Sequence, residues 1–158
     1  MSVADERDIR DIEEFVRKNY LDVYSYLYRR VLSVSDAQDL TQDTFLRYLS
    51  KVEKDEIDKK GRAYLFTIAK NICNDFYRKK LPAFVQITPE IEESLSAADS
   101  PGDGFDELIT SLDEELQEVL TLKYALGFGT NEIAEITGFS RFVVRRKLAR
   151  ALAELGKQ

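Results

Sequence analysis

Hydrophobic residues recur three or four positions apart along most of this chain, which is the spacing of one face of an α-helix. Between residues 6 and 81 this spacing predicts several helices, among them one over 37–49 and one over 62–80. Ser35 and Asp36 are placed to cap the first of these two helices. No stretch alternates convincingly with the period of two that a half-buried strand would show. The pattern therefore predicts an all-α fold.

Near the end of the chain the pattern predicts a long helix over 107–126, followed by a helix-turn-helix. Residues 130–137 form a short amphipathic segment, Gly138 suits a left-handed helix stop, and Ser140 is placed to cap a final helix. The expected core positions of the two longer helices are Leu108, Leu112, Leu116, Val119, Leu120 and Leu122 in the first, and Val144, Leu148, Ala151, Leu152 and Leu155 in the second.

The segment between the two helical regions is different in character. It is rich in Pro, Ser, Ala, Gly and acidic residues, and Pro101-Gly102-Asp103-Gly104 is typical of a turn or linker. We therefore predict two small helical domains, residues 1–81 and 106–158, joined by a flexible acidic linker over 82–105, with the helix-turn-helix in the second domain.

A net charge of −6 is unfavourable for binding DNA, but the charge is unevenly distributed. Residues 1–80 carry 16 basic and 15 acidic side chains, and residues 121–158 carry seven basic and three acidic ones. Residues 81–120 carry 11 acidic side chains and no Lys or Arg. Because the negative charge comes from this middle segment, both ends of the chain remain compatible with phosphate.

The residues do not indicate catalysis or metal binding. The chain has no His, no Gly-rich phosphate loop and a single cysteine, Cys73, which is expected in a helix core. The start of the chain is charged rather than signal-like, and no apolar run is long enough to cross a bilayer. We predict a non-enzymatic cytoplasmic protein with no cofactor, no metal and no membrane contact of its own.

The final helix is the strongest candidate for DNA binding, because Ser140 to Arg150 includes five basic residues and no acidic one. Such a helix can place its first residues at base edges in the major groove and its later cations on phosphates. The alternative is a solvated surface helix, and the preceding helix, turn and cap favour DNA. The candidate base-reading residues are Arg141, Phe142, Arg145 and Arg146, and the candidate phosphate contacts are Lys147 and Arg150.

Two further faces are candidates for binding. On the 62–80 helix, polar and basic side chains lie opposite the apolar side, and nearby aromatic rings could stack on bases. Cations at the end of a helix also suit its dipole, so both interpretations stay open. The same holds for an acidic and amide stripe on the 37–49 helix, which either faces solvent or meets a basic partner. The residues are Tyr64, Phe66, Tyr77, Lys70, Asn71, Asn74, Arg78 and Lys79 on the former, and Asp39, Gln42, Asp43 and Leu46 on the latter.

These segments resemble, in order, three parts of the extracytoplasmic-function (ECF) subfamily of bacterial sigma-70-type sigma factors. Residues 36–47 are similar to the helix that binds core RNA polymerase. Residues 62–71, with Asp75 and Arg78, resemble the part that recognises and melts the upstream edge of the minus-ten element. Residues 112–155 resemble the domain that reads the minus-thirty-five element. The resemblance implies an alternative sigma factor whose partners are core polymerase, promoter DNA and an anti-sigma factor.

The chain also departs from the family pattern. Tyr64 stands where the family usually has Trp, and Asp113 where Pro is common. Arg141, Phe142 and Val143 occupy positions often filled by smaller residues, including a Gly-Thr pair. The last departure falls at the base-reading end, so the promoter sequence cannot be carried over from the family. The family resemblance also suggests that the polar connection over Lys51 to Gly61 forms a wall of a pocket for a flipped base.

Two other functions fit parts of the sequence. A helix-turn-helix repressor with an N-terminal sensor or dimerisation domain explains the last helix but leaves the face of Asn71 and Arg78 unexplained. A sigma-like interaction adaptor explains the acidic charge but not the basic face between residues 140 and 150. For the acidic linker two roles are open: occupying a basic channel of the polymerase where nascent RNA would otherwise run, or shielding the basic helices of the free protein.

Overall fold

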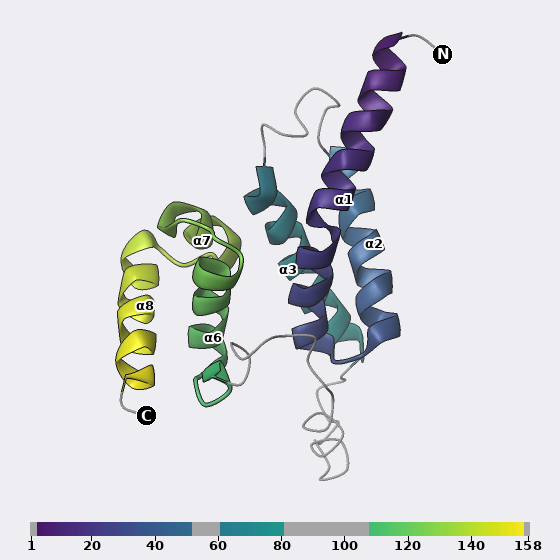
Figure 1. Cartoon of the computed structure of the whole chain (residues 1–158). Coiled ribbons are helices and arrows are strands. Elements are labelled where there is room, and N and C mark those ends of the chain that lie inside the picture. Colours follow the sequence, from purple (N-terminus) through teal and green to yellow (C-terminus); the bar gives the residue numbers. More distant parts are fainter. Residues whose placement is uncertain (1–2, 52–60, 81–107, 157–158) are drawn as a thin grey trace. The chain divides into compact units, whose positions relative to one another are not determined.

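A computed structural model of the protein shows two compact units, residues 1–100 and 101–158 (Figure 1). Every regular element that it describes is helical, as the hydrophobic pattern predicts. No helix among the described residues is long and apolar enough to cross a membrane. The predicted linker lies outside the described residues, so its limits stay a prediction. The structure describes residues 3–51, 61–80 and 108–156.

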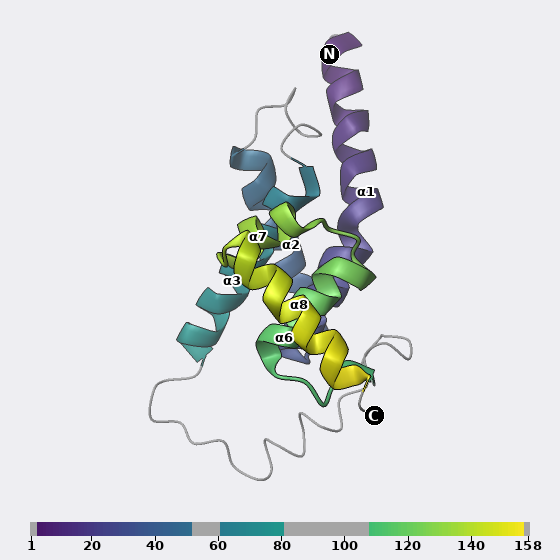
Figure 2. The same ribbon diagram turned by 90° about the vertical axis from the view of Figure 1, so that its left-hand side faces the viewer.

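The first unit is a bundle of three helices, α1 (Val3–Val31), α2 (Val34–Lys51) and α3 (Gly61–Lys80), each of which contacts the other two. The N-terminal part of α1 extends past the ends of its two neighbours (Figures 1 and 2). Aromatic rings fill much of the core: the Phe15 ring stacks on Tyr48 with centroids 4.9 Å apart and meets Phe45 edge-on at 6.3 Å. The bundle is therefore held by apolar packing between helices distant in sequence.

The turn from α1 to α2 corrects one expectation. Leu32 adopts a left-handed conformation with φ 55°, so α1 ends there. The Ser33 hydroxyl then accepts a hydrogen bond from the Asp36 backbone N–H at 3.3 Å. Ser33, rather than Ser35 or Asp36, caps α2, because α1 ends early enough for the next helix to begin at Val34.

Two fully buried threonines on α2 show how polar side chains enter this core. The Thr41 hydroxyl donates to the Ala37 carbonyl at 2.6 Å, and the Thr44 hydroxyl donates to the Leu40 carbonyl at 2.7 Å. Each bond satisfies the hydroxyl within its own helix, so neither threonine needs a polar partner on a neighbouring helix.

The second unit contains α6 (Glu114–Leu120), the π-helical turn η2 (Thr121–Ala125), α7 (Thr130–Thr137) and α8 (Arg141–Leu155). Helix α6 packs along α8, and α7 packs against both α8 and η2. The prediction of one continuous helix over 107–126 is wrong. A turn between Ile109 and Leu112 precedes Asp113, and the extended backbone of Asp113 begins α6. At the other end, the helix widens into the π-helical turn η2, and the Leu126 N–H donates to the Thr121 carbonyl.

The core of the second unit contains most of the expected positions, with two corrections. Leu108 is 52% exposed and Leu152 is 47% exposed, so neither belongs to the core. Ile109 is buried in place of Leu108, and Ala151 is buried as expected, because successive helical residues point about 100° apart. The residues that do pack together are Ile109, Leu112, Leu116, Leu120 and Ala151, with Leu148 and Leu155 partly buried against them.

Candidate polymerase and nucleic-acid interfaces

The acidic and amide stripe of α2 lies on the accessible side of the first unit. Asp39, Gln42, Asp43 and Leu46 are all exposed, and Leu46 is exposed to 65%. The residues on the other side of α2, among them Phe45, are buried in the bundle. Because the four positions follow the helical repeat, their side chains form one continuous surface in which a leucine lies beside two carboxylates. Such a surface suits a basic partner with an apolar contact of its own.

The polar face of α3 is also accessible. Asn71 and Asn74 are exposed, Lys70 is half-buried, and Ile72 and Cys73 are buried on the opposite side. Near the end of the helix, Arg78 and Lys79 are exposed, and Arg78 forms an ion pair with Asp75 at 3.0 Å. The arrangement presents two amides and a cationic helix end to solvent, so their proposed contacts with DNA are sterically open.

The aromatic rings near this face differ from the expectation. Phe66 is fully buried and meets Tyr26 edge-on with ring centroids 5.4 Å apart, so the interpretation of Phe66 as a stacking platform is wrong. Its position, three residues before the buried Ala69, places it on the core side of α3. Tyr64 is half-buried with its ring 5.9 Å from that of Tyr48, and Tyr77 is 37% exposed.

The start of α3 is held by a contact that the sequence did not suggest. Arg62 donates a hydrogen bond from Nε to Asn19 Oδ1 at 3.0 Å and forms an ion pair with Asp22 at 2.9 Å. Asn19 is itself buried and donates to the Phe15 carbonyl at 2.9 Å. These bonds fix the first turn of α3 against α1, and thus set the orientation of its polar face.

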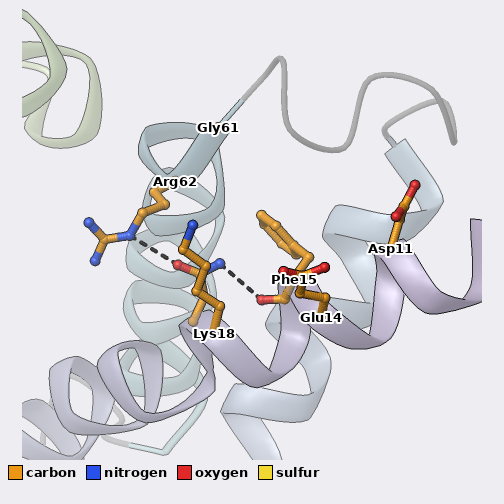
Figure 3. A pocket seen from close by; sticks show the side chains of 7 residues that line it. Asp11, Glu14, Phe15, Lys18, Gly61 and Arg62 are labelled. Carbon is orange, nitrogen blue, oxygen red and sulfur yellow. Dashed lines mark hydrogen bonds between the residues drawn. The ribbon is translucent and has the colours of Figure 1, made fainter.

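The same junction borders a cavity of about 250 Å³ between α1 and the start of α3 (Figure 3). Its lining mixes both charges, and a dashed line in the close-up view marks the hydrogen bond from Arg62 on α3 to Asn19 on α1. None of the predicted polymerase- or DNA-binding residues lines this cavity. The proposed flipped-base pocket, whose wall would be the connection after α2, falls outside the described residues. The lining residues are Asp11, Glu14, Phe15, Lys18, Asn19, Gly61 and Arg62.

The helix-turn-helix has the local geometry that its sequence predicts. Gly138 ends α7 with φ 82°, and its N–H bonds to the Ala134 carbonyl at 2.9 Å. The Ser140 hydroxyl accepts a hydrogen bond from the Val143 backbone N–H at 3.1 Å, which caps α8. Val144 is fully buried, so the first turns of α8 are anchored through one side only.

The opposite side of α8 is a continuous exposed surface. Arg141, Phe142, Arg145, Arg146 and Arg150 are all exposed on it. The Phe142 ring is 69% exposed, and the Arg146 guanidinium carbon lies 5.7 Å from its centroid. A capped helix that presents four guanidinium groups on one accessible side has the shape and charge for a DNA groove.

The two predicted phosphate contacts differ from each other. Lys147 Nζ lies 2.5 Å from Glu115 Oε2 on α6 and 5.0 Å from the centroid of the Phe139 ring, and its side chain is only 21% exposed. Arg150 pairs with Glu154 on its own helix at 3.2 Å and stays 65% exposed. Arg150 can therefore exchange its partner for a phosphate easily, whereas Lys147 would first have to leave α6.

Replacing Arg150 with Ala is expected to weaken DNA binding more than replacing Lys147 with Ala. Loss of one phosphate contact lowers the slope of log affinity against log salt by about 0.9. We expect that change for Arg150→Ala and a smaller one for Lys147→Ala, measured by the salt dependence of DNA binding. Glu115→Gln is the matched control, because it removes the charged partner of Lys147 and keeps the Lys147 side chain. Equal slopes for the two Ala variants would show that Lys147 does reach a phosphate.

Two family matches cover most of the chain. Residues 15–81 match sigma-70 region 2, and residues 103–155 match sigma-70 region 4. The RNA polymerase sigma factor YlaC of Bacillus subtilis is 30% identical over 92% of this chain and 90% of that protein. The ECF RNA polymerase sigma factor SigC of Mycobacterium tuberculosis is 27% identical over 90% of this chain and 80% of that protein. The chain belongs to the ECF subfamily of the sigma-70 family.

This RNA polymerase sigma factor directs transcription initiation. A repressor or an adaptor is not favoured, because both units match regions of sigma-70 and the relatives over most of the chain are RNA polymerase sigma factors. Sigma factors are generally non-enzymatic regulators of transcription. In fold, the sigma factor resembles RpoE from Bartonella quintana, solved in complex with the anti-sigma factor NepR, with a TM-score of 0.66 and 22% identity over 94% of this chain and 96% of that chain.

Proposed function

We propose that the two units divide promoter recognition between them. The stripe of Asp39, Gln42, Asp43 and Leu46 binds core RNA polymerase. The polar face of α3, with Tyr64 at its edge, holds unpaired bases of the minus-ten element, and the exposed side of α8 reads the minus-thirty-five element in duplex form. The observation that carries this proposal is the accessibility of all three faces, each opposite a well-packed core.

The chemistry of the two DNA-binding faces differs in a way that supports this division. Helix α3 offers the amides of Asn71 and Asn74, which can bond the edges of single bases once these are unstacked. Helix α8 offers guanidinium groups, which match the acceptor pair that guanine presents in the major groove of a duplex. We infer that melted DNA meets the first unit and intact duplex meets the second.

Three further aspects belong to the same proposal. The domains extend over residues 1–81 and 106–158, with 82–105 as the linker. The sigma factor acts in the cytoplasm as an alternative sigma factor without catalytic activity of its own, because the polymerase performs the chemistry. An anti-sigma factor regulates it, an inference supported by the solved sigma factor of the same fold that is bound to one.

Run-off transcription with purified core polymerase and DNA from upstream of the protein's own operon tests the proposal. We expect promoter-specific transcripts that require both the sigma factor and the core enzyme. A repressor would instead bind palindromic DNA tightly without polymerase, and an adaptor would give no specific transcript. Either result would exclude the proposed function.

Arg145→Ala is expected to change which upstream sequences are used. Arg145 is exposed in the second turn of α8, and a bidentate contact from Arg to guanine contributes about 1–3 kcal/mol to base discrimination. Transcription from a library randomised in the minus-thirty-five element should show relaxed preference at one base pair. Arg150→Ala is the matched control, and it should lower transcription from all sequences alike. Identical library profiles for the two variants would argue against base reading by α8.

Neutralising the acidic linker is expected to strengthen non-specific DNA binding by the free sigma factor. The five acidic residues to convert into amides are Glu90, Glu92, Glu93, Asp99 and Asp103. Exposed charges interact over about 8–10 Å at moderate salt, so a shielding linker competes with phosphate for the basic helices. Affinity at low salt should rise and its salt dependence should steepen. An unchanged affinity would leave the polymerase channel as the better explanation of the acidic segment.

A further inference from the structure

Phe142 and Arg146 form a pair on the exposed side of α8 that needs an explanation beyond helix stability. Phe142 is the second residue of the helix, two positions after the Ser140 cap, and 69% of it is exposed although it is apolar. Arg146 lies one turn later on the same face, where side chains four residues apart are neighbours. Its guanidinium carbon is 5.7 Å from the ring centroid, within the range of a cation–π contact.

The ring contributes nothing to the core of the second unit, because that core is formed from the opposite side of the helix by Val144, Leu148 and Ala151. The ring lies at the end of the helix that would enter a groove first, between cationic side chains that would bring it against DNA.

The chemistry of Phe142 and Arg146 matches two different chemical groups that bases present in the major groove. Apolar side chains recognise thymine through its C5-methyl group, and Arg recognises guanine through O6 and N7. The cation–π contact restricts the rotamers of Arg146, so less conformational entropy is lost when the guanidinium binds a base. Base pairs stack about 3.4 Å apart. The Arg146 guanidinium carbon and the Phe142 ring centroid are 5.7 Å apart, so the two side chains reach neighbouring or next-neighbouring base pairs.

We propose that Phe142 and Arg146 act as one base-reading unit that selects a thymine and a guanine within two base pairs of each other in the upstream promoter element. The Phe142 ring packs against the thymine methyl group and holds the Arg146 guanidinium toward the guanine. This inference rests on the proposed function, because it requires α8 to read duplex DNA.

The test uses the holoenzyme and a promoter library randomised in the upstream element. Arg146→Ala should lower discrimination for guanine at one position by about 5-fold to 100-fold, the equivalent of a lost bidentate contact. Phe142→Ala should remove the preference for thymine at a position no more than two base pairs away. It should also lower the guanine preference, so that the double variant Phe142→Ala with Arg146→Ala loses less than the sum of the two single effects.

A chemical substitution in the DNA isolates the methyl contact. Replacing the selected thymine with deoxyuridine removes only the methyl group, and should lower wild-type binding about fourfold, the value of one buried methyl group. The Phe142→Ala holoenzyme should not distinguish the two bases. Phe142→Leu, which keeps an apolar side chain but no ring, should retain part of the methyl effect. Because Phe142 and Arg146 are exposed, these variants should melt at the wild-type temperature.

Two outcomes would overturn the base-reading unit. One is an equal loss of binding on deoxyuridine substitution in the wild-type and Phe142→Ala holoenzymes, and the other is additive effects of the two single variants. Arg145→Ala separates this failure from failure of the proposed function. If Arg145→Ala still alters base preference, α8 reads DNA without the Phe142–Arg146 unit. If none of the three variants alters promoter choice, both the unit and base reading by α8 are wrong.

Discussion

Reversing the charges of Asp39 and Asp43 with arginine is expected to abolish co-purification of the sigma factor with core RNA polymerase. Both carboxylates are exposed on α2 beside Leu46, so a partner surface can reach them directly. Breaking a buried interfacial charge pair costs about 2–5 kcal/mol, and the new positive charges would also repel a basic partner. Co-purification from purified components measures the effect, and circular dichroism checks that helicity is unchanged.

The matched control changes the net charge equally on other elements. Glu13 and Glu135 are exposed on α1 and α7, and reversing both to arginine should leave co-purification intact. If the control also loses the polymerase, the interaction depends on overall charge rather than on the α2 stripe. If the Asp39 and Asp43 variant retains the polymerase, the interface lies elsewhere on the protein.

Replacing Asn71 and Asn74 with alanine is expected to impair promoter opening more than polymerase binding. Both amides are exposed on α3, and contacts to an unpaired base are worth about 1–3 kcal/mol each. Permanganate reactivity of thymines in the minus-ten region should fall strongly, because the melted state loses its contacts while the closed complex keeps the α2 stripe. Co-purification with core enzyme should stay near the wild-type level.

A control variant separates base contacts from general loss of an amide. Asn131 is exposed on α7, outside the predicted faces, and Asn131→Ala should leave permanganate reactivity unchanged. Equal losses of promoter opening and polymerase binding in the Asn71 and Asn74 variant would indicate a folding defect. Normal reactivity in that variant would show that other residues hold the melted bases.

Features that depend on neighbours within one or two helical turns could be predicted from the sequence. The limits of α7, the left-handed Gly138 and the Ser140 cap all agree with prediction, because each rests on residues no more than four positions apart. The accessible faces of α2, α3 and α8 follow for the same reason, since the helical repeat alone separates an apolar side from a polar one.

Features that depend on where one helix ends and how it packs were decided by the tertiary structure. The sequence predicted a single helix over 107–126, but packing of Ile109 and Leu112 in the core is accompanied by a turn before α6. The sequence also predicted that the Phe66 ring is available to stack on bases, although in the bundle this ring packs edge-on against Tyr26. Several apolar and aromatic residues fit a helix surface equally well, and only the neighbouring helix selects which of them is buried.

The long-range polar contacts were beyond prediction altogether. Arg62 donates a hydrogen bond to Asn19, 43 residues away in the sequence, and Lys147 donates one to Glu115, 32 residues away. No local spacing marks such partners, because any exposed carboxylate or amide could serve until the helices are packed. The sequence by itself therefore determined the all-helical fold, the helix-turn-helix with its caps and the class of protein. The tertiary structure decided which cations hold the helices together and which remain accessible for DNA, because that choice depends on distances between helices.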